Sequence, residues 1–97
     1  MYHGNLESKQ CDELFKAILT LESIEDCYRF FDDICSINEL KALIARWQVV
    51  KMLDAGVTYS EIAKQTGVST ATISRVSKCL AYGADGYKNA LKKIKNK

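Results

Sequence analysis

The stretch TYSEIAKQTGVSTATISR, residues 58–75, constrains the fold most, because two helical patterns meet there at one glycine with no room for a long loop. Thr58 and Glu61 form a capping box, in which each side chain is expected to accept a hydrogen bond from a backbone N–H of the first turn. Gly67 can end the first helix in the left-handed conformation without the steric cost of a Cβ, and Ser69 can cap the second. The stretch therefore predicts a helix-turn-helix.

The two predicted helices each have an apolar side and a polar side. We expect the inward positions to be Ile62, Ala63, Thr66, Val68, Ile73 and Val76. The outward side of the second helix carries Thr70, Thr72, Ser74 and Arg75. Short polar side chains suit a helix that enters a groove about one helix wide and touches base edges. The pattern favours a DNA-recognition helix, and the alternative is an ordinary helical corner packed in a core.

Charge is divided unevenly along the chain, although its overall formal net charge is only +2. Residues 1–57 contain 6 Lys and Arg against 10 Asp and Glu, a net charge of −4, whereas residues 58–97 contain 8 against 2, a net charge of +6. A basic half that contains the candidate recognition helix is typical of a DNA-binding face. The alternative is a solvated basic tail, since five of those eight positive residues lie from Lys88 onward.

Length and composition favour a single all-helical domain over residues 1–97. The chain has no proline and 47% hydrophobic residues, which suits packed helices and argues against disorder. Within it we expect dimerisation helices in residues 1–57, the helix-turn-helix in residues 58–80 and a C-terminal helix in residues 81–97. There is no apolar run of membrane-spanning length and no signal-peptide pattern at the start, so we expect a cytoplasmic protein without a membrane partner.

Helical spacing predicts three helices before the helix-turn-helix, over residues 8–21, 23–34 and 36–55. The third is apolar on nearly all sides, which requires that most of its surface be buried. A chain of 97 residues has few other elements to surround it, so a partner subunit is the simplest source of cover. We therefore expect an intertwined homodimer, and the alternative is a central helix wrapped by its own neighbours.

Cysteine and histidine usage argues against metal or catalytic chemistry. Cys11, Cys27, Cys35 and Cys79 form no C-x-x-C pair, and His3 is the only histidine. We interpret the cysteines as reduced thiols in the core. No nucleophile elbow and no phosphate-binding glycine loop is present, so we expect neither an enzyme, nor a cofactor, nor a metal site.

The segment SINELKALIARWQVVKMLDAGVTYSEIAKQTGVSTATISRVSKCL, residues 36–80, resembles the core of the Trp repressor superfamily. The sharpest similarity is residues 71–75, which match the A-T-I-[ST]-R stretch of that family's recognition helix. The sequence as a whole, including GADGYKNAL near the C-terminus, looks closer to the YerC/YecD branch than to the tryptophan-binding repressors. The resemblance implies a Trp-repressor-like intertwined dimer that binds a palindromic DNA operator as a repressor-like transcriptional regulator. The rival hypothesis is an adaptor that uses the helix-turn-helix to bind another protein.

The candidate binding residues come from the outward face and from this resemblance. The predicted DNA-binding residues are Ser60, Lys64, Ser69, Thr70, Ala71, Thr72, Ser74, Arg75 and Lys78. At Ser60 the resemblance implies the loss of a basic residue that helps to read DNA, which leaves the operator sequence open.

The resemblance also implies a possible effector pocket formed by Ser36, Arg46, Arg75, Val76 and Cys79. The two arginines match a pair that sandwiches the corepressor's indole ring in tryptophan-binding members. Val76 and Cys79 depart from a glycine and a serine beside that ligand. We therefore expect that L-tryptophan is not the effector. The arginines then bind a different, anionic effector, or Arg75 contacts phosphate while Arg46 pairs with a carboxylate.

Overall fold

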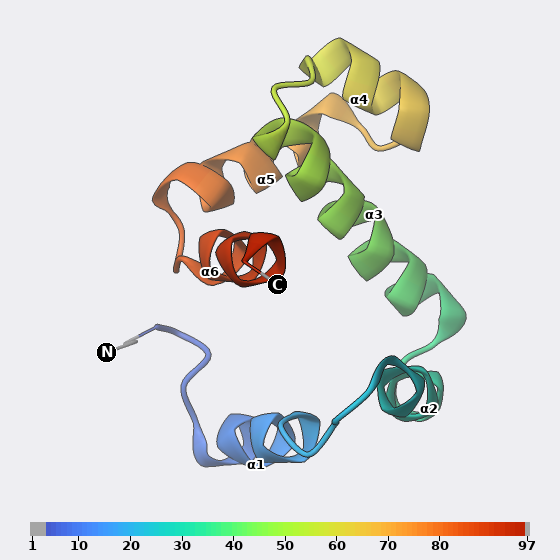
Figure 1. The fold of residues 1–97 in the computed structure, drawn as a ribbon, viewed down its shortest axis with the longest axis vertical. Helices are drawn as coiled ribbons and strands as arrows, with labels where there is room; N and C mark the ends of the chain where they lie inside the picture. The colour runs from blue at the N-terminus through green and yellow to red at the C-terminus, as the bar shows by residue number, and fades with distance from the viewer. Residues whose placement is uncertain (1–3, 97) are drawn as a thin grey trace. The chain divides into compact units, whose positions relative to one another are not determined.

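The computed structural model describes residues 4–96, so His3 lies outside the described residues. The described residues form six α-helices and no strand, which confirms the predicted all-helical class (Figure 1). The helices are α1 (Lys9–Ile18), α2 (Ile24–Ile34), α3 (Ile37–Asp54), α4 (Tyr59–Thr66), α5 (Thr70–Tyr82) and α6 (Gly86–Lys95). Within residues 4–96, none of these helices is both long and apolar enough to cross a membrane. The chain divides after Leu40 into two compact units, each described by itself below.

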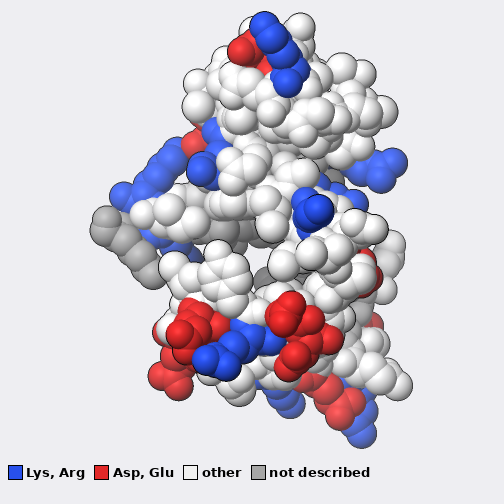
Figure 2. Space-filling model, turned by 90° about the vertical axis from the view of Figure 1, so that its right-hand side faces the viewer, with Lys and Arg blue, Asp and Glu red and all other residues white. Residues whose placement is uncertain are grey.

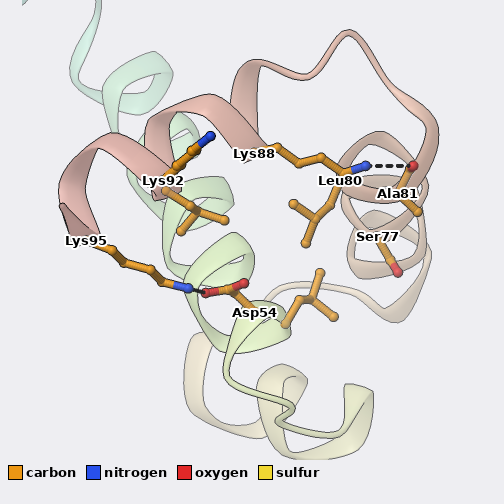
Figure 3. A pocket seen from close by; sticks show the side chains of 9 residues that line it. Asp54, Ser77, Leu80, Ala81, Lys88, Lys92 and Lys95 are labelled. Carbon is orange, nitrogen blue, oxygen red and sulfur yellow. Dashed lines mark hydrogen bonds and ion pairs between the residues drawn. The ribbon is translucent and has the colours of Figure 1, made fainter.

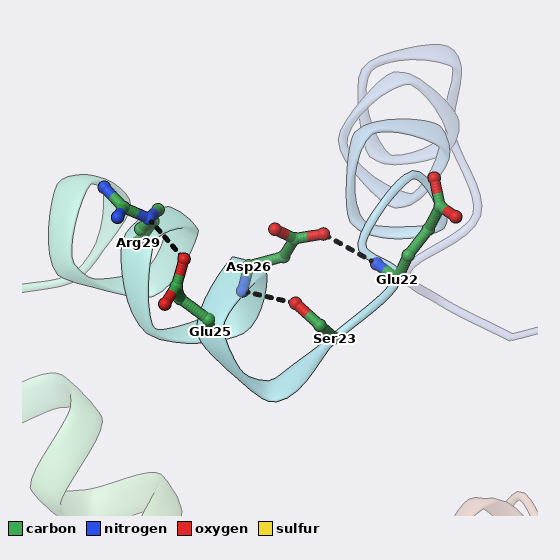
Figure 4. Close-up of polar contacts among 5 residues, drawn as sticks. All are labelled: Glu22, Ser23, Glu25, Asp26 and Arg29. Carbon is green, nitrogen blue, oxygen red and sulfur yellow. Dashed lines mark hydrogen bonds and ion pairs between the residues drawn. The ribbon is translucent and has the colours of Figure 1, made fainter.

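Serine residues begin both helices of the first unit. The backbone N–H of Cys11 donates to Ser8 Oγ at 3.1 Å, and that of Asp26 donates to Ser23 Oγ at 3.0 Å. The Asp26 carboxylate in turn accepts from the backbone N–H of Glu22 at 3.0 Å, which ties the entering chain to the first turn of α2 (Figure 4). Local hydrogen bonds of this kind satisfy donors that a helix start would otherwise leave unpaired.

Neither α1 nor α2 contains a buried residue. Both helices nevertheless have a strongly apolar side, and several large apolar side chains on them are exposed: Leu14, Phe15, Ile24, Tyr28 and Ile34. The apolar sides of α1 and α2 are therefore left largely exposed in the single chain.

A complete capping box opens α3. The backbone N–H of Ser36 donates to Glu39 Oε1 at 2.8 Å, and the backbone N–H of Glu39 donates to Ser36 Oγ at 3.2 Å. The pKa of the Glu39 carboxyl lies below its ordinary value. The main cause is the hydrogen bond from the Ser36 backbone, and the Ser36 side chain adds a smaller effect in the same direction. Both hydrogen bonds of an S-x-x-E capping box are thus present at the start of α3.

The second unit has one hydrophobic core to which each of its four helices contributes. Its buried members are Val49 and Val50 from α3, Ile62 from α4, Ile73 and Val76 from α5, and Leu91 from α6. Ala63 and Val68 pack against this cluster, as the sequence predicted. The helix-turn-helix therefore packs against α3 and α6 through this core.

The expectation that the cysteines lie in the core is wrong within a single chain. None of the four cysteines is buried: Cys11 and Cys35 are half-buried, and Cys27 and Cys79 are exposed. Periodicity alone does not say whether an apolar side of a helix is covered, and α1 and α2 contain no buried residue. At the start of α6, the N-cap residue Asp85 has φ 67° and its side chain makes no capping hydrogen bond.

Candidate nucleic-acid interface

Three residues, Gly67 to Ser69, separate α4 from α5, and hydrogen bonds fix their course. Gly67 has φ 73° and donates its N–H to Ala63 O at 2.9 Å, which ends α4 in the left-handed conformation that glycine adopts without strain. The Thr66 hydroxyl donates to Ile62 O at 2.7 Å and accepts from the backbone N–H of Val68 at 3.1 Å. The structure thus forms the predicted helix-turn-helix with a fixed, short turn.

The capping box predicted at the start of α4 is only half formed. The backbone N–H of Glu61 donates to Thr58 Oγ1 at 3.2 Å, as expected. The Glu61 carboxylate does not return to Thr58, because it accepts from Gln65 Nε2 at 2.9 Å one turn further along the helix. The side-chain amide at i+4 competes with the backbone N–H for the same carboxylate.

The start of α5 carries a contact that the sequence analysis did not identify. Ser69 is the cap residue, and its Oγ accepts from the backbone N–H of Thr72 at 3.2 Å. The same Oγ also forms a hydrogen bond with Thr72 Oγ1, at 3.1 Å. The sequence signal for this second contact is a cap serine followed three residues later by a threonine. That spacing, however, usually predicts only the hydrogen bond from the backbone N–H to the cap side chain.

All the predicted DNA-binding residues lie on α4, on the turn or on α5, and none is buried. Those that are exposed are Ser60, Lys64, Ser69, Thr70, Ala71, Arg75 and Lys78, whereas Thr72 and Ser74 are half-buried. Large exposed aromatic residues lie only at the ends of this region, with Tyr59 opening α4 and Tyr82, 90% exposed, closing α5. The N-terminal part of α5 is therefore a surface of short side chains.

Charge follows the same division as in the sequence. In Figure 2 the acidic side chains gather around α1 and α2, with some Lys and Arg among them, and the charged side chains elsewhere in the view are mostly Lys and Arg. Within α4 and α5 the charged residues are Lys64, Arg75 and Lys78 against Glu61 alone. This excess of positive charge favours contact with a polyanion.

The residues of the possible effector pocket have different surroundings. Ser36 belongs to the first unit, directly before α3, and the other four residues belong to the second. Arg46, Arg75 and Cys79 are exposed, whereas Val76 is only 3% exposed and forms part of the core. The Val76 side chain thus fills space in the hydrophobic core of the second unit.

A cavity of about 550 Å³ lies in the second unit between α3, α5 and α6 (Figure 3). Lys95 forms an ion pair with Asp54, and Lys88 Nζ donates to Ala81 O at 3.3 Å. The remaining lining residues are Leu53, Ser77, Leu80, Leu91 and Lys92. No local pattern in the sequence predicts this cavity, because its walls come from three helices that are separated along the chain.

Comparison with known proteins identifies the family. The Trp repressor protein family matches residues 9–95. The uncharacterized protein YerC of Bacillus subtilis (strain 168) is 53% identical over 95 residues, which cover 98% of this chain and 91% of that protein. A TrpR-like protein from Eubacterium eligens ATCC 27750 has a solved structure with a TM-score of 0.87 and 46% identity, with 92% of each chain covered. A solved structure from Staphylococcus aureus also has a TM-score of 0.87, with 50% identity over 93% of this chain and 90% of that one.

These matches confirm the resemblance seen in the sequence, including its closeness to YerC. The fold is that of the TrpR-like structures. Proteins of this family are regulators without enzymatic activity, so the chain is not an enzyme. The match spans nearly the whole chain at 46–53% identity, and the chain therefore belongs to the Trp repressor family.

Proposed function

We propose that this protein is a sequence-specific DNA-binding transcriptional regulator that acts in the manner of a repressor. The observation that carries the proposal is the N-terminal part of α5, which presents short polar side chains next to Lys64, Arg75 and Lys78 in a chain of the Trp repressor family. Short side chains let a recognition helix approach base edges, and the basic residues can contact phosphates. The surface lacks the large apolar anchors that a protein-binding adaptor would need there.

The regulator acts as an intertwined homodimer, in which residues 1–57 supply the dimerisation helices and residues 81–97 a C-terminal helix. Support comes from the exposed apolar sides of α1 and α2 and from exposed apolar residues in the first half of α3, Ile37, Leu43 and Ile44. Two-fold symmetry places two copies of α5 in successive major grooves about 34 Å apart, so the operator is a palindrome with half-sites about one turn apart.

Selection of bound sequences from random double-stranded DNA tests the proposal. We expect the purified protein to enrich an inverted repeat with half-site centres about 10 base pairs apart. Affinity for the enriched site should fall steeply as salt rises, because phosphate contacts release counterions. A matched oligonucleotide with one half-site scrambled is the control and should bind more weakly. If no sequence is enriched at any salt concentration, the protein does not read DNA and the adaptor hypothesis gains support.

L-tryptophan is not the effector of this protein. The resemblance places a glycine of the tryptophan-binding repressors at Val76, where the valine adds three carbons beside the ligand. Extra carbons in a packed site typically cost about 1–3 kcal/mol, or roughly one to two decades of affinity. Cys79 stands in place of a serine and forms weaker hydrogen bonds to the ligand's amino group.

Calorimetric titration with tryptophan should show no binding at millimolar ligand, and the affinity for the enriched DNA site should not change when tryptophan is added. The double variant Val76→Gly/Cys79→Ser should be titrated in the same way, because it restores the glycine and the serine that the resemblance implies for tryptophan-binding repressors. Micromolar binding by the unaltered protein would show that Val76 does not block the ligand.

A further inference from the structure

We propose that Thr66 is a positioning residue for DNA recognition, because its hydroxyl joins the last turn of α4 to the backbone that leads into α5. This inference rests on the proposed DNA-binding function and adds to it a residue that acts without touching DNA. Thr66 is half-buried and lies outside the set of predicted DNA-binding residues. The hydrogen bonds of its hydroxyl determine where the first turn of α5 lies.

Both hydrogen bonds of the Thr66 hydroxyl have a direction that the chemistry of the partner decides. The hydroxyl donates to Ile62 O at 2.7 Å, since a carbonyl oxygen can only accept. It accepts from the backbone N–H of Val68 at 3.1 Å, since an N–H can only donate. Its single proton is thus used on α4, and one of its lone pairs is used on the turn. One side chain therefore links the two segments.

The turn has few other hydrogen bonds. Gly67 is tied to α4 through its N–H, which donates to Ala63 O at 2.9 Å. Within residues 4–96, the N–H of Val68 bonds only to the Thr66 hydroxyl, and the N–H of Ser69 bonds to no acceptor. Thr66 therefore supplies the last hydrogen bond between α4 and the chain before α5 begins.

The hydrophobic core holds the middle of α5 but not its first turn. Ile73 and Val76 are the buried residues of this helix, whereas residues 70–72 are exposed or half-buried. Those first residues are the ones that a recognition helix brings to base edges. Their place depends on the course of the turn, where Val68 packs against the core and Thr66 holds its backbone.

A small displacement at this place is enough to change base recognition. Thr70 lies three residues before Ile73, or about 4.5 Å along the helix axis, so a tilt of α5 by about 10° around Ile73 moves Thr70 by roughly 0.8 Å. Recognition geometry has to be held within about 0.5 Å. Phosphate contacts made by Lys64 or Lys78 tolerate such a shift, because a lysine is a point charge on a flexible stem. Loss of the Thr66 hydroxyl should therefore weaken specific binding more than non-specific binding.

Three variants of the full chain test the inference, each compared with the unaltered protein. Thr66→Val removes the hydroxyl and keeps the branched shape, whereas Thr66→Ser keeps the hydroxyl. Thr20→Val is the matched control, because the Thr20 hydroxyl also donates to a carbonyl at a helix end, Ala17 O at 2.6 Å, but lies outside the helix-turn-helix.

Affinity is measured for a duplex that carries the enriched site and for a scrambled duplex of the same length. Thr66→Val should bind the enriched site about five- to tenfold more weakly, the size of one hydrogen bond. Its affinity for the scrambled duplex should change by less than about twofold, because phosphate contacts dominate there. Thr66→Ser and Thr20→Val should bind both duplexes as the unaltered protein does. Circular dichroism melts of each variant ensure that folded protein is compared.

Amide hydrogen exchange tests the turn without DNA. In the unaltered protein the Val68 N–H should exchange at least about tenfold more slowly than the Ser69 N–H, after correction for intrinsic rates, because only the first is hydrogen-bonded. Thr66→Val should bring the two rates within about threefold of each other. Thr66→Ser should keep them apart.

Different failures have different meanings. If the unaltered protein enriches no sequence, the proposed function is wrong and the role of Thr66 in recognition falls with it. If a site is enriched but Thr66→Val binds it as the unaltered protein does, the inference alone is wrong. The same holds if Thr66→Val weakens binding to both duplexes equally, or if Thr66→Ser behaves like Thr66→Val. Equal exchange of the Val68 and Ser69 N–H groups in the unaltered protein would show that the hydroxyl does not hold the turn.

Discussion

The substitution Ile73→Ala should lower the free energy of unfolding by about 2–5 kcal/mol, the usual range when a large aliphatic side chain is removed from a core. Ile73 is 0% exposed and packs in the cluster that joins all four helices of the second unit. A domain of this size typically has about 5–15 kcal/mol of stability in total, so the change removes a large part of it. The loss should be visible as a fall of the melting midpoint by about 10 °C or more.

Arg75→Ala is the matched control for Ile73→Ala, because Arg75 is exposed and lies two residues further along α5. Surface substitutions of this kind usually change stability by no more than about 0.5 kcal/mol. Both variants should be melted at the same protein concentration, since the midpoint of a dimer depends on it. Equal midpoints for the two variants would mean that α5 is not packed against α3, α4 and α6 as described.

The substitution Phe15→Glu should weaken dimerisation by about 2 kcal/mol or more, which is roughly 30-fold in Kd. Phe15 is 48% exposed on α1, a helix without a buried residue. In the proposed dimer its ring is covered by the partner chain, and a carboxylate at that place would have to be buried without a partner charge. Sedimentation of a dilution series should show the unaltered protein with twice the chain mass of 10.9 kDa and the variant dissociating at higher concentration.

Lys16→Glu introduces the same residue at the neighbouring position, on the polar side of α1, and is the control for Phe15→Glu. It should leave the dimer intact, because an exposed charge contributes little to association. The melting midpoint of the unaltered protein should also rise with its concentration. A mass of one chain at micromolar concentration, or a midpoint that does not depend on concentration, would contradict the dimer.

The sequence determined the elements that depend on residues three or four positions apart. The serine caps of α2 and α5, the closed box of Ser36 and Glu39, and the turn at Gly67 all rest on such short-range hydrogen bonds. Apolar spacing likewise predicted the inward residues of the helix-turn-helix, Ile62 and Ile73 among them. These features could be predicted because cap preferences, the 3.6-residue period and the freedom of glycine act within one or two helical turns.

Tertiary structure alone decided which side of each helix is covered. Periodicity assigned Cys27 and Cys79 to the core, but both are exposed in the single chain. The cavity beside Lys88 and Lys95 arises where three helices meet. Such outcomes depend on packing between segments far apart in the chain and on side-chain geometry, neither of which a local pattern encodes.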